Sequence, residues 1–170
     1  MAKNPTLKQL ESDSIHVLSK IVQVILDHPR WIKVLLPNVK KESYGNVMID
    51  VQCVSSRKMT LLNSNFRKKN FDTDVLSFPA PDVFQMNGYL GDLVISKSKL
   101  IAQAAEYKHS VKVELQILLV HGVLHLTGLD HEAGKAKAKK MAEWEWKILQ
   151  NLLSSRDRAL PGLIHRTSIR

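Results

Sequence analysis

The sequence has little cysteine: one residue, Cys53, among 170. A single cysteine cannot form a disulfide within the chain, which excludes the disulfide-stapled class of small secreted proteins and predicts a reducing compartment. Cys53 lies in an apolar alternating run, so we expect a buried structural thiol, with a thiolate metal ligand as the alternative. The first residues, MAKNPTLKQLESDS, lack the apolar core of a signal peptide. Both absences predict a cytoplasmic protein.

Long hydrophobic runs are also missing. No stretch reaches the roughly 18 apolar residues that span a bilayer, so we expect no membrane insertion. Acidic side chains are few, because 16 Asp and Glu stand against 25 Lys and Arg, for a formal net charge of +9. This excess favours a polyanionic partner, nucleic acid first and a membrane surface second, with a solvated basic surface as the alternative.

Helical and strand patterns alternate along the chain. Alternating apolar and β-branched residues predict strands at 47–54, 74–79 and within 89–99. Helical periodicity predicts helices at 14–28, 55–70, 99–109, 111–128 and 133–153, with a polar break at 38–46 and a loop at 80–88. Strands interleaved with helices indicate an α/β fold with one small sheet. We expect one domain over 1–155 and a basic, flexible tail over 156–170.

Two of these helices carry most of the expected core. The segment 111–128 is apolar nearly throughout, which predicts a buried central helix that Gly128 ends. The last helix is amphipathic. Its apolar residues at helical spacing favour core packing over a cofactor site: Met141, Trp144, Ile148 and Leu152.

The stretch HGVLHLTGLDH places three histidines near the end of the central helix. His121 and His125 are four residues apart, so they lie on one helical face, and Gly128 allows the chain to turn so that His131 returns beside them. A lone histidine on an apolar helix is more often a hydrogen-bonded core residue, but three at this spacing indicate a metal site. Zinc held by three imidazoles keeps an open position for water and lowers the pKa of that water towards about 7.

The same stretch lacks the base that a zinc protease needs. HxxxHxxGxxH is the metzincin protease pattern, in which the residue after the first histidine is glutamate, whereas this chain has Gly122. Asp130, Glu132 and Glu114 are nearby acids; Asp130 either orients a ligand histidine or is a solvent-facing turn residue. Phosphodiester cleavage suits what remains, because a metal and an arginine stabilise the charge that develops on phosphoryl oxygens.

The segment NFRKKNFDTDVLSFP offers that arginine. Arg67 and the two lysines after it lie at a predicted helix end, where cations complement the helix dipole; a solvated basic turn is the alternative. Arg67 is the candidate catalytic residue, because a planar guanidinium grips a phosphate through two hydrogen bonds. Thr73 and Asp74 are candidate turn caps and Ser77 is a candidate cleft residue, with packing as the favoured alternative for each.

Three blocks together resemble the YbeY family of metal-dependent endoribonucleases and rRNA maturation factors: FRKKNFDTDVLSFP, YLGDLVIS and HGVLHLTGLDH. They come in the family's order and cover roughly residues 46–150. The resemblance implies one α/β domain, with a small mixed sheet packed against several helices and the metal site on the buried central helix. It implies one zinc or other divalent ion per chain, held by His121, His125 and His131, and a functional role for Arg67.

The resemblance also implies a function. Members are zinc-dependent, single-strand-specific endoribonucleases that act in maturation of the small-subunit rRNA 3′ end and in ribosome quality control. The implied partners are single-stranded RNA, rRNA, and the small ribosomal subunit with its proteins; no membrane is involved, and nothing in the sequence sets the oligomeric state. Two alternatives remain: a metallopeptidase-like amide hydrolase, and a non-catalytic assembly factor with structural metal, for which Cys53 or His109 would be the fourth ligand.

The chain departs from the family pattern at two places. Asp72 precedes Thr73, where many members have proline, so we expect a less rigid turn there. The first 40 or so residues and the basic tail match no family signature, so a role for the tail in phosphate contacts rests on charge alone.

Overall fold

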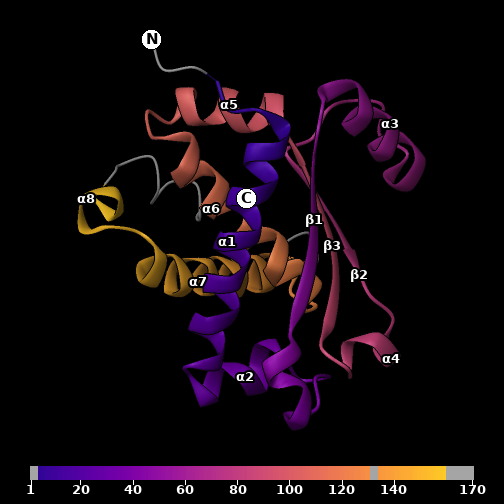
Figure 1. Cartoon of the computed structure of the whole chain (residues 1–170), viewed down its shortest axis with the longest axis vertical. Coiled ribbons are helices and arrows are strands. Elements are labelled where there is room, and N and C mark those ends of the chain that lie inside the picture. The colour runs from indigo at the N-terminus through magenta and orange to yellow at the C-terminus, as the bar shows by residue number, and fades with distance from the viewer. Residues whose placement is uncertain (1–3, 131–133, 160–170) are drawn as a thin grey trace.

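The computed structural model describes residues 4–130 and 134–159 (Figure 1). Its strands are β1 (Met48–Val54), β2 (Val75–Pro79) and β3 (Tyr89–Ser96). Its helices are α1 (Leu7–Leu26), α2 (Pro29–Leu35), the 3-10 helix η1 (Lys41–Asn46), α3 (Ser56–Arg67), α4 (Asp82–Gln85), α5 (Lys97–Glu106), α6 (Val111–Leu126), α7 (Lys135–Leu152) and α8 (Ser155–Arg158). Among the described residues, no helix is long and apolar enough to cross a membrane.

The three strands form one mixed sheet in the order β1-β3-β2. β1 runs parallel to β3, and β2 runs antiparallel to it. β2 is therefore an edge strand, and α3 lies between β1 and β2 in the chain. This small mixed sheet with surrounding helices confirms the expected α/β fold.

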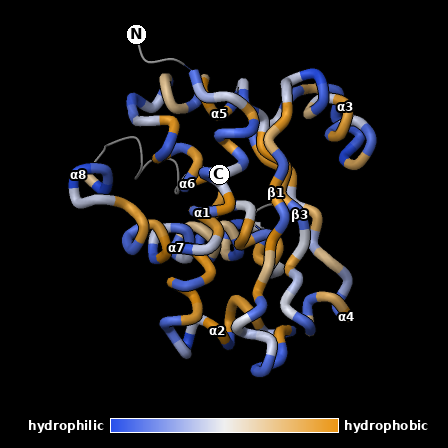
Figure 2. The backbone as a smooth tube through the Cα atoms, viewed as in Figure 1, coloured by the Kyte–Doolittle hydropathy of each residue, from blue (hydrophilic) through white to orange (hydrophobic). Residues whose placement is uncertain are grey.

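Helices cover the two faces of the sheet unequally. α1 packs on β1, and α6 packs on β2 and β3, with α5 and α7 next to α6. On the opposite side lies α3, where Met59 packs with Val54, Leu76 and Val94. Figure 1 shows α3 on one side of the strands and α1, α6 and α7 on the other, and Figure 2 shows apolar residues recurring along the elements that meet there. The core therefore lies between the sheet and the α1–α6–α7 layer.

α6 is the central helix of this core. Nearly all of its residues are buried, because the sheet, α1, α5 and α7 surround it. Burial on all sides explains why its sequence is apolar without a polar stripe. This confirms the expectation of a buried central helix over 111–128, although the helix ends two residues earlier, at Leu126. Gly128 follows with a φ of 86°, a left-handed conformation that turns the chain away.

α6 packs closely against β3 at Gly122. A Cβ atom at Gly122 would lie 2.8 Å from Cδ2 of Leu93 on β3, closer than carbon atoms normally approach. Leu93 is itself fully buried, so its side chain has little room to move. Glycine at this position therefore allows the helix and the strand to pack, and any larger side chain would require Leu93 to move.

Replacing Gly122 with alanine is expected to lower the free energy of unfolding. Overpacking costs about 1–3 kcal/mol, and the better helix propensity of alanine returns about 1 kcal/mol, so the net loss is about 1 kcal/mol. Urea denaturation measures it. The matched control is Gly45→Ala, because an added Cβ there meets nothing within 4 Å. A Gly122→Ala protein as stable as this control would contradict the close approach.

Several element boundaries differ from the sequence prediction. α1 begins at Leu7 rather than at residue 14, because the hydroxyl of Thr6 accepts a hydrogen bond from the Gln9 amide and caps the helix. Ser14, at the expected start, is buried inside the helix, and its hydroxyl donates to the Leu10 carbonyl. The expected loop at 80–88 contains α4, which begins after Pro81.

The expected tail over 156–170 lies mostly outside the described residues. Its first part belongs to α8, a short helix in which the Ser154 hydroxyl accepts from the Asp157 amide. Residues 160–170 lie outside the described residues.

Cys53 is a buried thiol, as the sequence predicted. It is 3% exposed on β1, and its Sγ lies 4.0 Å from the Ser14 hydroxyl of α1. Burial raises the pKa of the Cys53 thiol to about 11. Because the thiolate is the metal-binding form, this environment disfavours Cys53 as a ligand.

Candidate metal centre

Two of the predicted ligands come together on α6. The Nε2 atoms of His121 and His125 lie 3.2 Å apart, and the two rings are nearly perpendicular, with centroids 4.7 Å apart. His121 is buried at 5% exposure, whereas His125 is partly exposed. Two imidazole nitrogens at this distance share a proton in a hydrogen bond when no metal is bound, and the same pair of nitrogens suits a shared cation.

A carboxylate from α7 fixes the orientation of the first histidine. Oε1 of Glu145 lies 2.5 Å from Nδ1 of His121, and both side chains are almost fully buried. If Nδ1 carries the proton and donates to this carboxylate, Nε2 keeps a free lone pair directed towards His125. Metal-binding histidines in proteins commonly have such a carboxylate partner, which sets the tautomer and raises ligand basicity.

Glu145 was missed by the sequence reasoning, although a signal for it exists. It lies four residues after Met141 and three before Ile148, so it shares their helical face. Met141 and Ile148 are core residues, and Glu145 is 6% exposed beside them. A carboxylate on the apolar stripe of a helix needs a buried partner, and the histidines of α6 were the available ones.

Glu145→Gln is expected to weaken metal binding by about 10- to 100-fold, because the amide no longer supplies the negative charge that strengthens His121 as a ligand. Competition with a chelator of known affinity measures the change. Glu143→Gln is the matched control, because Glu143 is exposed on the same helix. Equal metal affinity in the two variants would contradict a role for Glu145 in orienting His121.

A cleft of about 270 Å³ brings His125 together with residues from distant parts of the chain. It is lined by Arg67, Ser77, Pro79, His125, Gly128, Leu129 and Asp130. These residues come from the end of α3, from the edge strand β2, from α6 and from the turn after it. The fold therefore brings Arg67 and His125 into one cleft, and Ser77 lines it as the sequence suggested.

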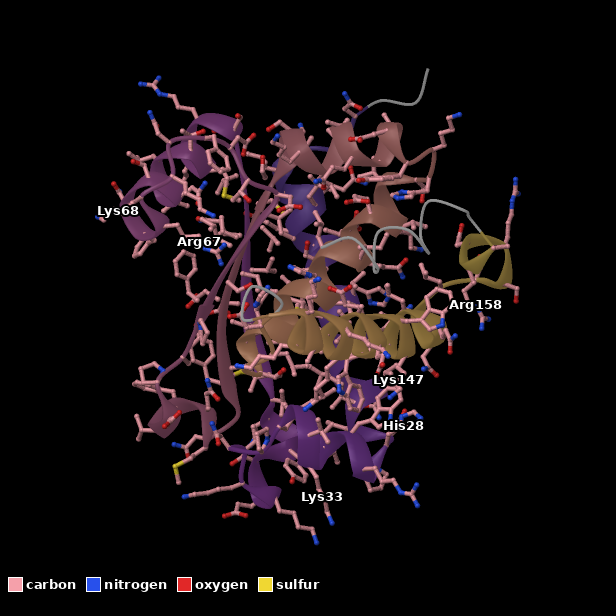
Figure 3. All side chains as sticks on the ribbon, turned by 180° about the vertical axis from the view of Figure 1, so that it is seen from behind. His28, Lys33, Arg67, Lys68, Lys147 and Arg158 are labelled. Atoms are coloured by element: carbon pink, nitrogen blue, oxygen red, sulfur yellow. The ribbon has the colours of Figure 1, made fainter. Side chains whose placement is uncertain are left out.

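The end of α3 presents Arg67 to this cleft. Figure 3 shows Arg67 on the side of α3 nearer the strands, and Lys68 at the outer edge of the helix. Lys68 has a φ of 60°, a left-handed conformation that ends the helix directly after Arg67. Asn63 holds the following turn, because its buried amide donates to the Phe71 carbonyl at 2.8 Å. Arg67 therefore extends from a fixed helix end, where its charge also complements the helix dipole.

Hydrogen bonds fix the turn at which proline was expected. The Asp72 carboxylate accepts from the hydroxyls of Ser96 and Ser98 at 3.1 and 3.0 Å, which ties the turn to the start of α5. The Asp74 carboxylate accepts from the Val75 amide at 2.9 Å. The Asp72 carboxylate therefore connects this turn to the start of α5 through hydrogen bonds that a proline could not make.

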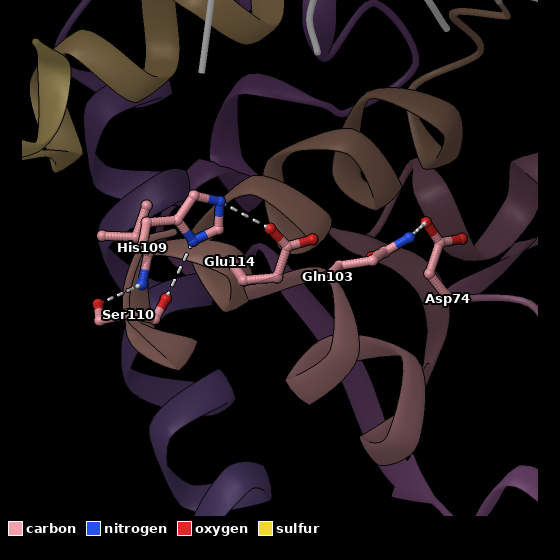
Figure 4. Close-up of polar contacts among 6 residues, drawn as sticks. Asp74, Gln103, His109, Ser110 and Glu114 are labelled. Carbon is pink, nitrogen blue, oxygen red and sulfur yellow. Dashed lines mark hydrogen bonds and ion pairs between the residues drawn. The ribbon is translucent and has the colours of Figure 1, made fainter. Parts of the chain in front are cut away.

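The two proposed fourth ligands lie elsewhere. Nε2 of His109 lies 3.2 Å from a Glu114 carboxylate oxygen, and both side chains are almost fully buried (Figure 4). Glu114 precedes His121 by seven residues, about 10 Å along the helix axis. Figure 4 also shows Asp74 accepting a hydrogen bond from Gln103 of α5, at 3.1 Å. His109 and Cys53, the proposed fourth ligands, therefore contact Glu114 and Ser14 instead. Asp74 likewise has its partner in Gln103.

The third predicted ligand, His131, lies outside the described residues, as does Glu132. In the part of the chain that the structure describes, no group of three His, Cys, Asp or Glu side chains is placed to hold a metal ion. Asp130, the last described residue before this gap, lines the cleft beside His125.

Comparison with known proteins gives consistent matches. A family model described as Endoribonuclease YbeY matches residues 15–153. A protein of Thermodesulfovibrio yellowstonii named Endoribonuclease YbeY is 36% identical over 148 residues, which cover 85% of this chain and 92% of that protein. One of Aquifex aeolicus with the same name is 42% identical over 108 residues, covering 64% and 72%. The solution structure of TM1509 from Thermotoga maritima matches with a TM-score of 0.55 and 26% identity, covering 93% of this chain and 90% of that one.

Proposed function

The chain belongs to the endoribonuclease YbeY family, as its three motifs predicted, and on this premise we propose that it is a zinc-dependent, single-strand-specific endoribonuclease. Its proposed role is maturation of the small-subunit rRNA 3′ end and ribosome quality control, in the cytoplasm. Its partners would be rRNA and the small ribosomal subunit with its proteins. The observation that carries the proposal is the cleft in which Arg67 and His125 meet.

The described donors fit a divalent metal. Nε2 of His121 and Nε2 of His125 converge, and the Glu145 carboxylate supports the first of them. His131 is the proposed third ligand, and another divalent ion in place of zinc is compatible with the same donors. When bound, the ion supplies Lewis-acid activation of water and of a phosphoryl oxygen.

The other groups of the cleft are suited to an RNA phosphate. The Arg67 guanidinium would hold the non-bridging oxygens of the scissile phosphate and stabilise the negative charge that develops on them during cleavage. Ser77 supplies a hydroxyl to the same cleft, and that hydroxyl lies 3.4 Å from the Gly122 carbonyl. A single strand suits this site, since its phosphates are not held in the geometry of a duplex.

Specific observations disfavour the two alternative functions. A peptidase with the metzincin pattern has its base directly after the first histidine, where this chain has Gly122 packed against Leu93. A non-catalytic factor with structural zinc needs a fourth protein ligand. Cys53 and His109, the candidates for it, contact Ser14 and Glu114 instead.

The proposal is tested by incubating the metal-loaded protein with a single-stranded RNA from the small-subunit rRNA 3′ end and with the same RNA annealed to its complement. We expect internal cleavage of the single strand, little cleavage of the duplex, and loss of both after chelation. Equal cleavage of the two substrates would exclude single-strand specificity. Cleavage of an unfolded protein that chelation abolishes would favour the peptidase instead.

A further inference from the structure

Phe66 and Phe78 form an aromatic pair next in sequence to residues of α3 and β2 that line the cleft. Phe66, in the last turn of α3, is 64% exposed. Its ring meets that of Phe78 on β2 edge to face, with centroids 4.9 Å apart and an angle of 70° between the planes. Phe78 is partly buried and packs against the core on that side of the sheet, so it holds the Phe66 ring from beneath. Most of a rigidly seated ring is thus open to solvent.

This pair and the cleft share the same edge strand. Phe66 and Arg67 are consecutive residues of a helix, so their side chains diverge by about 100° around its axis. Arg67 lines the cleft, and Phe66 rests on Phe78 instead. Ser77 and Pro79 of β2 line the cleft, and Phe78 between them points to the opposite face of the strand. A strand of RNA that leaves the cleft over β2 therefore meets Phe66 directly after Arg67.

The segment that carries Phe66 is basic, which favours a polyanionic partner. From residue 55 to residue 71 the chain has no acidic residue. The same segment carries five exposed cations: Arg57, Lys58, Arg67, Lys68 and Lys69. Phe71, in the turn after α3, is a further aromatic residue, 57% exposed. Exposed rings among cations are typical of surfaces that bind single-stranded nucleic acid, where cations follow the backbone and rings stack on bases.

We propose that Phe66, seated against Phe78, stacks on a base of the single-stranded RNA whose neighbouring phosphate Arg67 holds. This proposal rests on the proposed function and names a substrate-binding residue for it. It also gives a physical reason for single-strand preference. Within a duplex both faces of a base are covered by its stacked neighbours, so the exposed ring of Phe66 finds a partner only in unpaired RNA.

The test compares Phe66→Leu, Phe66→Trp and Phe84→Leu with the wild type. Binding to a fluorescein-labelled single-stranded RNA is followed by anisotropy at 4 °C, and the RNA is checked afterwards for integrity. Phe66→Leu keeps an apolar side chain without the ring, and we expect affinity about ten-fold lower, equivalent to about 1.4 kcal/mol. Phe66→Trp should bind within two-fold of wild type. Phe84 is 56% exposed on α4, at the other end of the sheet, so Phe84→Leu is the matched control (Figure 1).

The salt dependence separates stacking from charge. Phe66→Leu removes no phosphate contact, so the slope of log affinity against log salt should equal that of wild type. Arg67→Ala should reduce the slope by about 0.7, the value for one phosphate contact on a single strand. Affinity of Phe66→Leu for a matched duplex should be unchanged.

The stacking proposal and the nuclease function are tested by different results: RNA affinity of the Phe66 variants tests the first, and RNA cleavage by the wild type tests the second. If Phe66→Leu binds single strands as tightly as wild type does, the stacking proposal is overturned, even when the wild type cleaves RNA. A ten-fold loss that Phe66→Trp restores would support stacking even when the wild type cleaves nothing, and only the nuclease function would then be lost. If Phe66→Trp also loses affinity for single strands, and the Phe66 variants lose affinity for the duplex as well, the stacking proposal is overturned, because the defect in RNA binding is then general.

Discussion

His125→Ala is expected to lower the rate of RNA cleavage by more than about 100-fold. Loss of a residue that only orients a metal ligand typically costs 10- to 100-fold, so loss of a ligand itself costs more. His125 is a better choice than His121. The Glu145 carboxylate pairs with His121 in a buried position, and removing that partner would leave a buried charge that destabilises the fold. His125 is partly exposed, so its loss should leave the fold intact.

The control for this variant is His16→Ala, because His16 is exposed on α1. Cleavage is measured as an initial rate at saturating RNA, together with the zinc content of each protein and its thermal unfolding midpoint. We expect His16→Ala to match the wild type in all three measurements. A His125→Ala protein that is folded, lacks zinc and cleaves at the wild-type rate would exclude the proposed metal centre.

Arg67→Ala is expected to lower kcat by about 100- to 1000-fold, the usual effect of removing a group that stabilises developing charge in a transition state. Because the interaction strengthens as charge develops, kcat should fall more than the affinity for RNA. Arg67→Lys should restore only a small part of the rate, since an ammonium cannot make the paired hydrogen bonds of a guanidinium. Steady-state kinetics with a short single-stranded RNA separates kcat from KM.

Arg30→Ala is the matched control for Arg67→Ala. Arg30 is an exposed arginine on α2, which lies at the far end of the molecule from α3 (Figure 1). Both substitutions remove one positive charge, so a general electrostatic effect would appear in both. A fall in rate of equal size in the two variants would assign Arg67 to long-range attraction of RNA rather than to the reacting phosphate.

Features set by local rules were predictable from the sequence. The strand at 47–54 follows from β-branched alternation, and the start of α3 follows from the Ser55 cap. The juxtaposition of His121 and His125 follows from the helical repeat, because residues four apart share a face. In each case the residues that determine the feature lie within a few positions of one another, so the local sequence pattern is enough to predict it.

Features set by packing between distant segments were not predictable in the same way. Glu145 reaches His121 only because α7 packs on α6. The cleft joins Arg67 to His125, 58 positions later in the sequence, only because α3 and α6 flank the same edge strand. The early start of α1 was missed for a local reason. Its first turns are largely polar and exposed, so their apolar periodicity is weak, and the start depends on the Thr6 cap.

The most direct test of the account is a zinc titration of the metal-free protein followed by RNA cleavage at each point. We expect no RNA cleavage without metal, a cleavage rate that rises with added zinc, and a plateau at one zinc ion per chain. Metal content by elemental analysis and cleavage of a single-stranded RNA from the small-subunit rRNA 3′ end are measured on the same samples. Cleavage that is independent of zinc, or one bound zinc per chain without cleavage of this RNA or of assembled small subunits, would contradict it.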